Sequence, residues 1–256
     1  MKKIALITGA TSGIGKATAL KLAKQNYNLI ITGRRKDMLE ELKKELGIKY
    51  KCDVLSLNFD VRDKQMVDET IDSIPDAWRK IDVLVNNAGL AAGLNPIQTG
   101  EIEDWEQMID TNIKGLLYIT RKIVPFMIAN GYGHIINISS IAGKEVYENG
   151  NVYCGTKHAV DAITKGMRID LVKHQIKVTS ISPGMVDTEF SLVRFKGDQQ
   201  RAEKVYEGFT PLFAEDIADA ILFAVTRPPH VNINDMLIMP TAQANAVVVH
   251  REPPVK

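Results

Sequence analysis

The chain has 256 residues, of which 45% are hydrophobic and 25% charged, enough for one α/β domain with a sizeable core. Its 32 basic and 31 acidic side chains leave a formal net charge of +1, so we expect no nucleic-acid partner and no membrane partner. The apolar run before Gly9 is too short for a signal peptide, and no stretch nears the roughly 20 apolar residues of a membrane span. We therefore expect a cytoplasmic protein in which Cys52 and Cys154 stay reduced, and their spacing predicts no metal site.

The first predicted element is a short buried strand at 2–8, which runs into a glycine-rich turn and then a helix at 16–25. Gly9, Gly13 and Gly15 allow the backbone to turn tightly and approach a pyrophosphate, while the amides at the start of the helix face its negative charge. The alternative is a glycine-rich connection without a ligand. The turn predicts a dinucleotide site made by consecutive residues, Gly9, Ala10, Thr11, Ser12, Gly13 and Ile14.

The second predicted strand, 28–32, ends in Gly33-Arg34-Arg35, where an NAD site would carry an acidic residue for the ribose 2′-hydroxyl. A guanidinium offers a planar fork of donors that suits a phosphate. Arg34 and Arg35 are therefore predicted to bind the 2′-phosphate of NADP. The alternative is an ordinary basic surface loop before the helix at 36–46, but the position of the two arginines after the second strand favours the phosphate site.

The remaining segments continue the alternation of strands and helices. Further strands are expected at 56–60, 81–85, 134–139, 177–182 and 235–239, and further helices at 103–130 and 152–173. Pro125 is a point at which the longest helix could kink. Because strands that alternate with helices favour a parallel sheet, the sequence predicts an α/β fold. We expect a single Rossmann-type doubly wound domain over 1–256, with a seven-stranded parallel sheet and helices on both faces.

A tyrosine and a lysine on the helix at 152–173 are placed for proton transfer. Tyr153 and Lys157 lie one helical turn apart on the same face. A phenol ordinarily has a pKa of about 10, and a neighbouring ammonium lowers this pKa by stabilising the phenolate. Ser140, upstream at the end of a predicted strand, could hold a substrate oxygen beside the phenol. On its own the Tyr-Lys spacing is more often a packed tyrosine with a solvated lysine, so the glycine turn is what favours the catalytic interpretation.

Two segments near the C-terminus lack a clear hydrophobic periodicity. The first, 188–210, is expected to be irregular from Thr188 to about Gln200 and then to form a polar helix. Because it follows the strand at 177–182, we interpret it as a lid over the site. The second segment is a C-terminal tail at 241–256 that contains Pro253-Pro254.

Several motifs, in order along the chain, resemble those of the classical short-chain dehydrogenases/reductases. They are Thr8-Gly9-Ala10-Thr11-Ser12-Gly13-Ile14-Gly15, Asp60-Val61, Asn86-Asn87-Ala88-Gly89, the tetrad Asn112, Ser140, Tyr153 and Lys157, and Pro183-Gly184. Thr11 replaces the serine that is common in this family. The resemblance implies catalysis by the tetrad, in which Asn112 positions Lys157, and its spacing selects Ser140 over Ser139. It also implies a homotetramer and further cofactor contacts from Asp60, Val61, Asn87, Ala88, Gly89, Tyr153, Lys157, Pro183, Gly184, Val186 and Thr188.

Within this family the chain is most similar to the NADP-dependent 3-hydroxy acid dehydrogenases, also called serine or L-allo-threonine dehydrogenases. Residues 32–35, 189–198 and 230–234 carry this similarity. It implies an NADP-dependent enzyme acting on CH–OH groups, which interconverts a small 3-hydroxy acid and its 3-oxo acid or semialdehyde. The implied substrates include L-allo-threonine, L-serine and 3-hydroxypropionate. Arg194 is predicted to bind the substrate carboxylate while Ser140 binds the hydroxyl; the alternative is that Arg194 faces solvent or a neighbouring subunit.

Two other functions stay open at the level of sequence. The chain could reduce another carbonyl, such as a ketoacyl thioester, a sulfonated aldehyde or a steroid-like ketone. It could also be a nucleotide-sensing regulator that performs no chemistry, although such a protein has no use for a Tyr-Lys pair aligned with Ser140.

Overall fold

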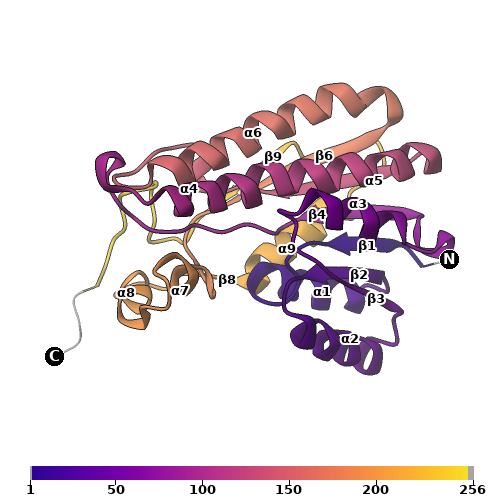
Figure 1. Ribbon diagram of the computed structural model, residues 1–256, viewed down its shortest axis with the longest axis horizontal. Helices are drawn as coiled ribbons and strands as arrows, with labels where there is room; N and C mark the ends of the chain where they lie inside the picture. Colours follow the sequence, from indigo (N-terminus) through magenta and orange to yellow (C-terminus); the bar gives the residue numbers. More distant parts are fainter. Residues whose placement is uncertain (1, 253–256) are drawn as a thin grey trace.

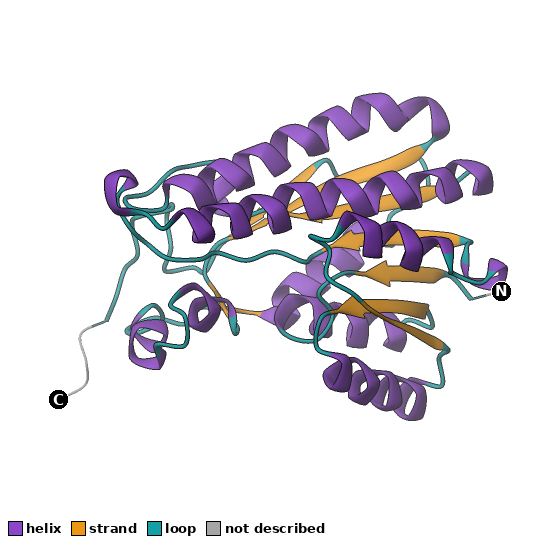
Figure 2. Ribbon diagram, viewed as in Figure 1, coloured by secondary structure: helices purple, strands orange, loops and turns teal. Residues whose placement is uncertain are grey.

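The predicted sheet is present in the computed structural model, which describes residues 2–252. Seven parallel strands lie in the order β3-β2-β1-β4-β5-β6-β9 between layers of helices (Figure 1, Figure 2). The chain order therefore reverses between the neighbours β1 and β4. The strands are β1 (Ile4–Ile7), β2 (Asn28–Gly33), β3 (Val54–Asn58), β4 (Ile81–Asn86), β5 (Gly133–Ile138), β6 (Ile176–Pro183) and β9 (Asp235–Ile238).

Alternate residues of the strands face opposite helical layers, because successive side chains of a strand point to opposite faces. In β1, Ala5 and Ile7 belong to one buried cluster and Ile4 and Leu6 to another. The first cluster includes side chains of α1 (Gly13–Lys24), α2 (Lys36–Tyr50) and α9 (Ala214–Val225). The second includes side chains of α3 (Lys64–Asp72), α5 (Leu116–Asn130) and α6 (Asn151–Leu171). The prediction of a parallel sheet with helices on both faces is confirmed.

The long helix predicted at 103–130 is divided into three consecutive parts. α4 (Ile102–Ile109) leads into a π-helical turn at Asp110–Gly115, which continues as α5. Pro125 lies inside α5, and the irregular stretch is the π-helical turn upstream of it, which contains Asn112. Single π-helical turns inside α-helices often occur at functional sites. Short 3₁₀ turns occur at Asp76–Trp78, Ile97–Thr99, Ile141–Gly143 and Val172–His174.

The segment at 188–210 is more regular than predicted. Its polar helix, α8 (Gln199–Lys204), is present, but α7 (Phe190–Arg194) occupies much of the stretch that we expected to be irregular, so that expectation was wrong. A single turn of five residues is too short to give a hydrophobic period. Two short parallel strands, β7 (Val186–Asp187) and β8 (Leu212–Phe213), pair at the base of this segment. Figure 1 places α7 and α8 beyond the carboxyl end of the sheet.

The C-terminal tail contacts the 188–210 segment. Gln243 and Val249 form an isolated antiparallel bridge. Farther along, Arg251 Nη2 donates to the carbonyl of Val205 at 2.9 Å and Glu252 N donates to that of Gly208 at 2.7 Å. The remainder of the predicted tail, including Pro253-Pro254, lies outside the described residues. No helix between residues 2 and 252 is long and apolar enough to cross a membrane.

His134 predicts a specific dependence of stability on pH. The side chain is fully buried, its Nε2 lies 2.7 Å from Thr179 Oγ1, and burial lowers its pKa to about 3. Below pH 6.5 the unfolded chain binds a proton at this histidine that the folded chain does not, so stability falls as the pH is lowered from 6.5 toward 3. This group should remove about 2 kcal/mol between pH 7 and pH 5.

Urea unfolding at pH 7 and pH 5 should therefore give a smaller difference in unfolding free energy for His134→Gln than for the wild-type protein. The same substitution at the exposed His230 controls for the loss of a histidine. Equal differences in His134→Gln and wild type would contradict the account of a buried, neutral imidazole.

Candidate active site

The predicted cofactor residues lie in loops at the carboxyl ends of the strands. Such loops meet at one edge of a parallel sheet, and ligands bind in the crevice where the strand order reverses. Here that crevice lies at the ends of β1 and β4. The structure brings together the residues after β1 (Gly9–Ile14), β2 (Arg34, Arg35), β3 (Asp60, Val61), β4 (Asn87–Gly89) and β6 (Gly184, Val186, Thr188).

The turn after β1 has a backbone that suits a pyrophosphate. Gly9 and Gly13 adopt φ values of 64° and 50°, which favour glycine. A Cβ at Gly15 would lie 2.3 Å from the Gly9 carbonyl oxygen, so the helix can approach the turn only without a side chain there. Within residues 2–252, the Ser12 side chain makes no capping hydrogen bond at the start of α1, and the first turn of this helix carries no acidic residue. The amide groups at this helix start are therefore available to an anion.

Thr8 connects the ends of β1 and β4. Its hydroxyl oxygen accepts hydrogen bonds from the backbone N–H of Asn87 at 3.0 Å and of Ala88 at 2.9 Å. The Asn87 side chain in turn donates to the carbonyl oxygens of Thr8 and Gly9. These bonds hold the two loops at a fixed separation and so set the width of the crevice between them.

Arg35 lies on the glycine-rich turn. Its Nε and Nη2 donate to Thr11 Oγ1 at 3.2 and 2.9 Å, and its Nη2 also donates to Ser12 Oγ at 2.7 Å. Its Nη1 pairs with Glu189 Oε2 at 2.9 Å. Arg34 is less constrained, since its Nη1 lies 3.8 Å from Asp60 Oδ2 and its side chain is 55% exposed. The Arg35 guanidinium and two hydroxyls thus meet where the 2′-phosphate is predicted, and Arg34 follows the same strand.

Asp60 is kept ionised beside these arginines. Burial acts to raise the pKa of this carboxyl, but hydrogen bonds from Arg62 and the charges of Arg62 and Arg34 prevail, so its pKa is below the ordinary value. Arg62 Nη2 and Nε donate to Asp60 Oδ2 at 2.7 and 3.0 Å. Asp60 is therefore a fixed negative charge next to the loop in which Arg34 and Arg35 supply positive charge.

α6 brings Tyr153 and Lys157 into the interior, as their spacing predicts. Both are buried, and Lys157 Nζ lies 5.9 Å from the centroid of the Tyr153 ring. The ammonium donates to the carbonyl oxygen of Ile138 at 2.9 Å, which fixes it at the end of β5. Gly89 lies close to both catalytic side chains: a Cβ there would be tight against Asn112 Oδ1 at 3.2 Å and at ordinary contact distance, 3.5 Å, from Lys157 Nζ.

Burial shifts the pKa of each proton-transfer group in the direction that favours the neutral form of its side chain. It lowers the pKa of Lys157 from 10.5 to about 8. Burial also raises the pKa of Tyr153, as does the neighbouring Tyr147, whereas hydrogen bonding to Ser140 and the charge of Arg194 act to lower it. Burial has the largest effect on the pKa of the phenol, and Ser140 and Arg194 are the neighbours that act to lower it.

Ser140 and Ser139 have different surroundings at the end of β5. Ser140 is half-buried, and its hydroxyl accepts from Ala142 N at 3.1 Å and donates to the carbonyl of Pro183 at 3.5 Å. Ser139 is buried, with its hydroxyl 3.4 Å from the carbonyl of Lys157. Of the two serines, Ser140 is the one with a partly exposed side chain, and its role toward a substrate oxygen stays a prediction.

Asn112 joins three parts of the site. Its Oδ1 accepts from Leu90 N at 2.9 Å, and its Nδ2 donates to Leu90 O at 2.8 Å and to Thr156 Oγ1 at 3.0 Å. The π-helical turn is thereby bonded both to the loop after β4 and to α6, one residue before Lys157. Asn112 is thus bonded to the helix that carries Lys157, and its role in positioning the lysine stays a prediction.

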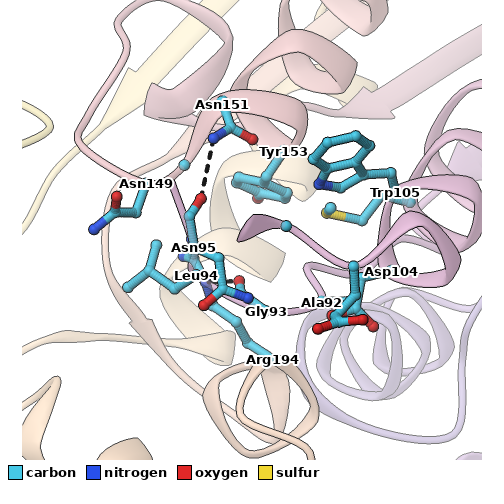
Figure 3. Close-up of a pocket in the computed structure, with 14 residues that line it drawn as sticks. Ala92, Gly93, Leu94, Asn95, Asp104, Trp105, Asn149, Asn151, Tyr153 and Arg194 are labelled. Carbon is cyan, nitrogen blue, oxygen red and sulfur yellow. Dashed lines mark hydrogen bonds between the residues drawn. The ribbon is translucent and has the colours of Figure 1, made fainter. Parts of the chain in front are cut away.

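Arg194 points inward from the end of α7, beside Tyr153 (Figure 3). Its Nε donates to Gly93 O at 3.2 Å and its Nη1 to Tyr147 Oη at 3.0 Å. Its guanidinium carbon lies 5.6 Å from the centroid of the Tyr153 ring. The third nitrogen, Nη2, is buried and finds no hydrogen-bond partner within residues 2–252. A buried donor without an acceptor costs about 1–3 kcal/mol, so this nitrogen fits a site that an anion completes.

The same region contains a small cavity and a second attachment of the 188–210 segment. Tyr153, Arg194, Gly93 and Asp104 are among the residues that line the cavity, whose volume of about 10 Å³ admits roughly one water molecule (Figure 3). Lys196 Nζ pairs with the buried Asp104 carboxylate at 2.9 Å. Together with the bonds between Arg194 and Gly93, this ion pair fastens the segment to the loop after β4 and to α4.

Several residues that shape the site were not found from sequence. Tyr147 and Gly93 orient Arg194, but each lies in a loop without hydrophobic periodicity or a motif. Glu189 begins the segment 189–198 that carries the family similarity, but nothing in the sequence indicates that it pairs with Arg35. Thr156, which bonds Asn112, lies directly before Lys157 on α6. Its position on the buried face of the helix was the one available signal.

Asn112→Ala should lower both stability and turnover. The substitution leaves the buried Leu90 backbone groups without their side-chain partner, at a cost of about 2–4 kcal/mol. It also frees α6 from the π-helical turn, so kcat should fall well below that of wild type at a temperature where both are folded. Urea unfolding and initial rates would measure the two effects. Asn130→Ala, at the exposed end of α5, removes only an exposed hydrogen bond to Arg79 and should affect both far less, and a fully active Asn112→Ala would contradict the positioning role.

Comparisons with known proteins agree with this geometry. The pattern that defines the short chain dehydrogenase family matches residues 3–198. The chain is 48% identical over 250 residues to an NADP-dependent 3-hydroxy acid dehydrogenase of Salmonella typhi, covering 97% of this chain and 99% of that protein. An enzyme of Schizosaccharomyces pombe with the same description is 45% identical over 251 residues, covering 98% of this chain and 97% of that one.

A solved structure is also similar over its whole length. The closed form of a serine dehydrogenase complexed with NADP⁺ matches with a TM-score of 0.92 and 46% identity, covering 97% of this chain and 100% of that one. The sequence motifs, the crevice at the reversal of strand order and these alignments lead to one conclusion. The chain belongs to the short-chain dehydrogenase family.

Proposed function

We propose that the protein is an NADP-dependent oxidoreductase that interconverts a small 3-hydroxy acid and its 3-oxo acid or semialdehyde. The observation that carries this proposal is the guanidinium of Arg194 over the Tyr153 ring, with its buried Nη2 free among the described residues. A substrate carboxylate supplies the missing acceptor and fixes the 3-hydroxyl near the phenol. The descriptions of the relatives, 3-hydroxy acid dehydrogenases and a serine dehydrogenase, support the same substrate class.

The cofactor assignment rests on the residues of the crevice. The glycine-rich turn would hold the pyrophosphate, and Arg34 and Arg35 the 2′-phosphate. Asp60 and Val61 would flank the adenine, while the loops after β4 and β6 would flank the nicotinamide. The free amides of α1 and the converging hydroxyls of Thr11 and Ser12 support this assignment.

The mechanism follows from the positions of the four catalytic residues. Held by the glycine-rich turn and the arginines, NADP would supply the acceptor for the hydride of the hydroxyl-bearing carbon, and NADPH would supply the hydride in the reverse direction. During oxidation Tyr153 takes the proton of the substrate hydroxyl, and during reduction it gives the proton back. Ser140 holds the same oxygen, and the ammonium of Lys157 favours the phenolate. Asn112 holds the helix that carries both Tyr153 and Lys157.

We also propose that the 188–210 segment is a lid. Arg194 and Lys196 attach it to Gly93 and Asp104, and the cavity beneath it has room for about one water molecule. A 3-hydroxy acid is larger than this cavity, and outward movement of the segment would make room for it. Closure would then carry Arg194 onto the carboxylate and exclude water from Tyr153.

A cytoplasmic homotetramer remains our prediction for the assembly. Apolar side chains are exposed on the helices of one layer, among them Leu117 and Ile128 of α5 and Ile169 of α6. Exposed apolar side chains on neighbouring helices suit contacts between subunits.

Tyr153→Phe should abolish turnover and leave NADPH binding nearly unchanged, because it removes the transferable proton and keeps the ring. The expected loss of kcat is about 100-fold to 10,000-fold, the usual contribution of a general acid or base. Steady-state rates and a fluorescence titration with NADPH would measure the two quantities. Tyr118→Phe, on α5, serves as the matched control. More than about a tenth of wild-type activity in Tyr153→Phe would exclude Tyr153 as the proton carrier.

Arg194→Ala should distinguish a hydroxy acid enzyme from a general carbonyl reductase. Loss of a charge-assisted contact should lower kcat/KM for 3-hydroxypropionate by about 1.5–3 kcal/mol, roughly tenfold to 150-fold, mainly through KM. An uncharged alcohol such as 1-propanol should be affected far less. Arg201→Ala removes another arginine of the lid, one that lies over Phe195, and should spare both substrates.

Tyr147→Phe adds a finer test of the same proposal. It keeps the ring beside Arg194 but removes the oxygen that accepts from Nη1. We expect a smaller increase in KM for the acid, in the same direction. Equal proportional losses for the acid and the alcohol in Arg194→Ala would mean that Arg194 only supports the lid.

A further inference from the structure

Arg35 already has an anionic partner, and that partner comes from the lid. Its Nε and Nη2 are held by the hydroxyls of Thr11 and Ser12 on the glycine-rich turn. Its Nη1 donates to Glu189 Oε2 at 2.9 Å. The two hydroxyls accept from the guanidinium and hold it in place as an anion site, and a carboxylate of the same chain occupies one side of it.

Glu189 is held next to the glycine-rich turn by its neighbour in the chain. Thr188, the preceding residue, lies so close to the turn that a Cβ at Gly13 would meet its methyl group at 3.2 Å. Glu189 directly precedes α7, the helix that ends in Arg194. The Arg35–Glu189 pair therefore links the cofactor site to the helix that closes the substrate site.

We propose that Glu189 competes with the 2′-phosphate of NADP for Arg35, and so tunes the affinity and the release of the cofactor. This inference rests on the proposed role of Arg35 in binding that phosphate. A 2′-phosphate carries more charge than a carboxylate and can displace it from the guanidinium, whereas the 2′-hydroxyl of NAD cannot. Glu189 thus weakens the binding of only those ligands that bear the 2′-phosphate.

The competition has a kinetic consequence. When NADP leaves, Arg35 regains Glu189 as its partner, so its charge is never left unpaired during release. The carboxylate should therefore accelerate cofactor dissociation, a step that limits turnover in many enzymes. Both side chains are nearly half exposed, at 43% and 47%, so solvent screens the pair and the effect should be modest.

Glu189→Gln in the intact protein provides the test. Titration calorimetry with NADP⁺ and with 2′,5′-ADP should give dissociation constants about twofold to tenfold lower than in wild type. Those for NAD⁺ and 5′-AMP, which lack the 2′-phosphate, should stay unchanged. Stopped-flow release of NADPH should slow by the same factor. Unchanged or weaker binding of NADP⁺, or equal shifts for both pairs of ligands, would overturn the proposal.

Two further variants separate this mechanism from general effects of charge. Glu203→Gln removes a lid carboxylate that accepts from Gln199, remote from the glycine-rich turn, and should not tighten NADP⁺ binding. An equal tightening there would overturn the proposal. In an Arg35→Gln background, Glu189→Gln should lose its effect. If Arg35→Gln alone leaves NADP⁺ affinity unchanged, the assigned role of Arg35 fails, a result distinct from failure of the competition.

Discussion

A lysine ammonium buried without a carboxylate partner is the constraint on which the site depends. Lys157 is 6% exposed, and its one hydrogen bond among the described residues is to the Ile138 carbonyl. Burial of a charge without a full ion pair is unfavourable, which is why the pKa of Lys157 falls to about 8. The surrounding structure must hold this side chain in place, and it does so through β5, α6 and the π-helical turn that contains Asn112.

The same burial explains how the proposed lid would contribute to proton transfer. In a dry site the phenol of Tyr153 resists ionisation, and positive charge nearby has a larger effect than it would in water. Arg194, at the end of α7 in the proposed lid, lies 5.6 Å from the ring centroid. Closure of the lid would therefore complete the electrostatic environment of the phenol at the moment when it surrounds the substrate.

One short helix connects the two halves of the crevice. α7 is preceded by Glu189, which pairs with Arg35 at the cofactor end, and it terminates at Arg194, which lies at the substrate end. Only four residues lie between them, so we expect a displacement of one contact to affect the other. This arrangement gives a physical route by which the state of the cofactor site is felt where the substrate binds.

The sequence predicted those features that depend on local pattern. The strands and helices follow from hydrophobic period, and their carboxyl ends meet in one crevice because parallel strands require it. The π-helical turn at Asn112 was not predicted, since no short-range signal distinguishes it from the helix around it. The partners of Arg194 and Arg35 could not be predicted from the sequence either. Gly93 lies 101 residues from Arg194, and Glu189 lies 154 residues from Arg35. Contacts across such separations are set by tertiary packing, so no local pattern encodes them.

The central claim is that one site combines a 2′-phosphorylated nicotinamide cofactor with a carboxylate-bearing alcohol. Its most direct test is the initial rate of NADPH formation with purified protein across 3-hydroxypropionate, 3-hydroxyisobutyrate, L-serine and L-allo-threonine, beside uncharged alcohols of similar size. The account predicts turnover of at least one of these acids, with kcat/KM well above that for its uncharged counterpart and with NADP⁺ preferred to NAD⁺. Turnover of uncharged alcohols or ketones alone, or a preference for NAD⁺, would contradict it.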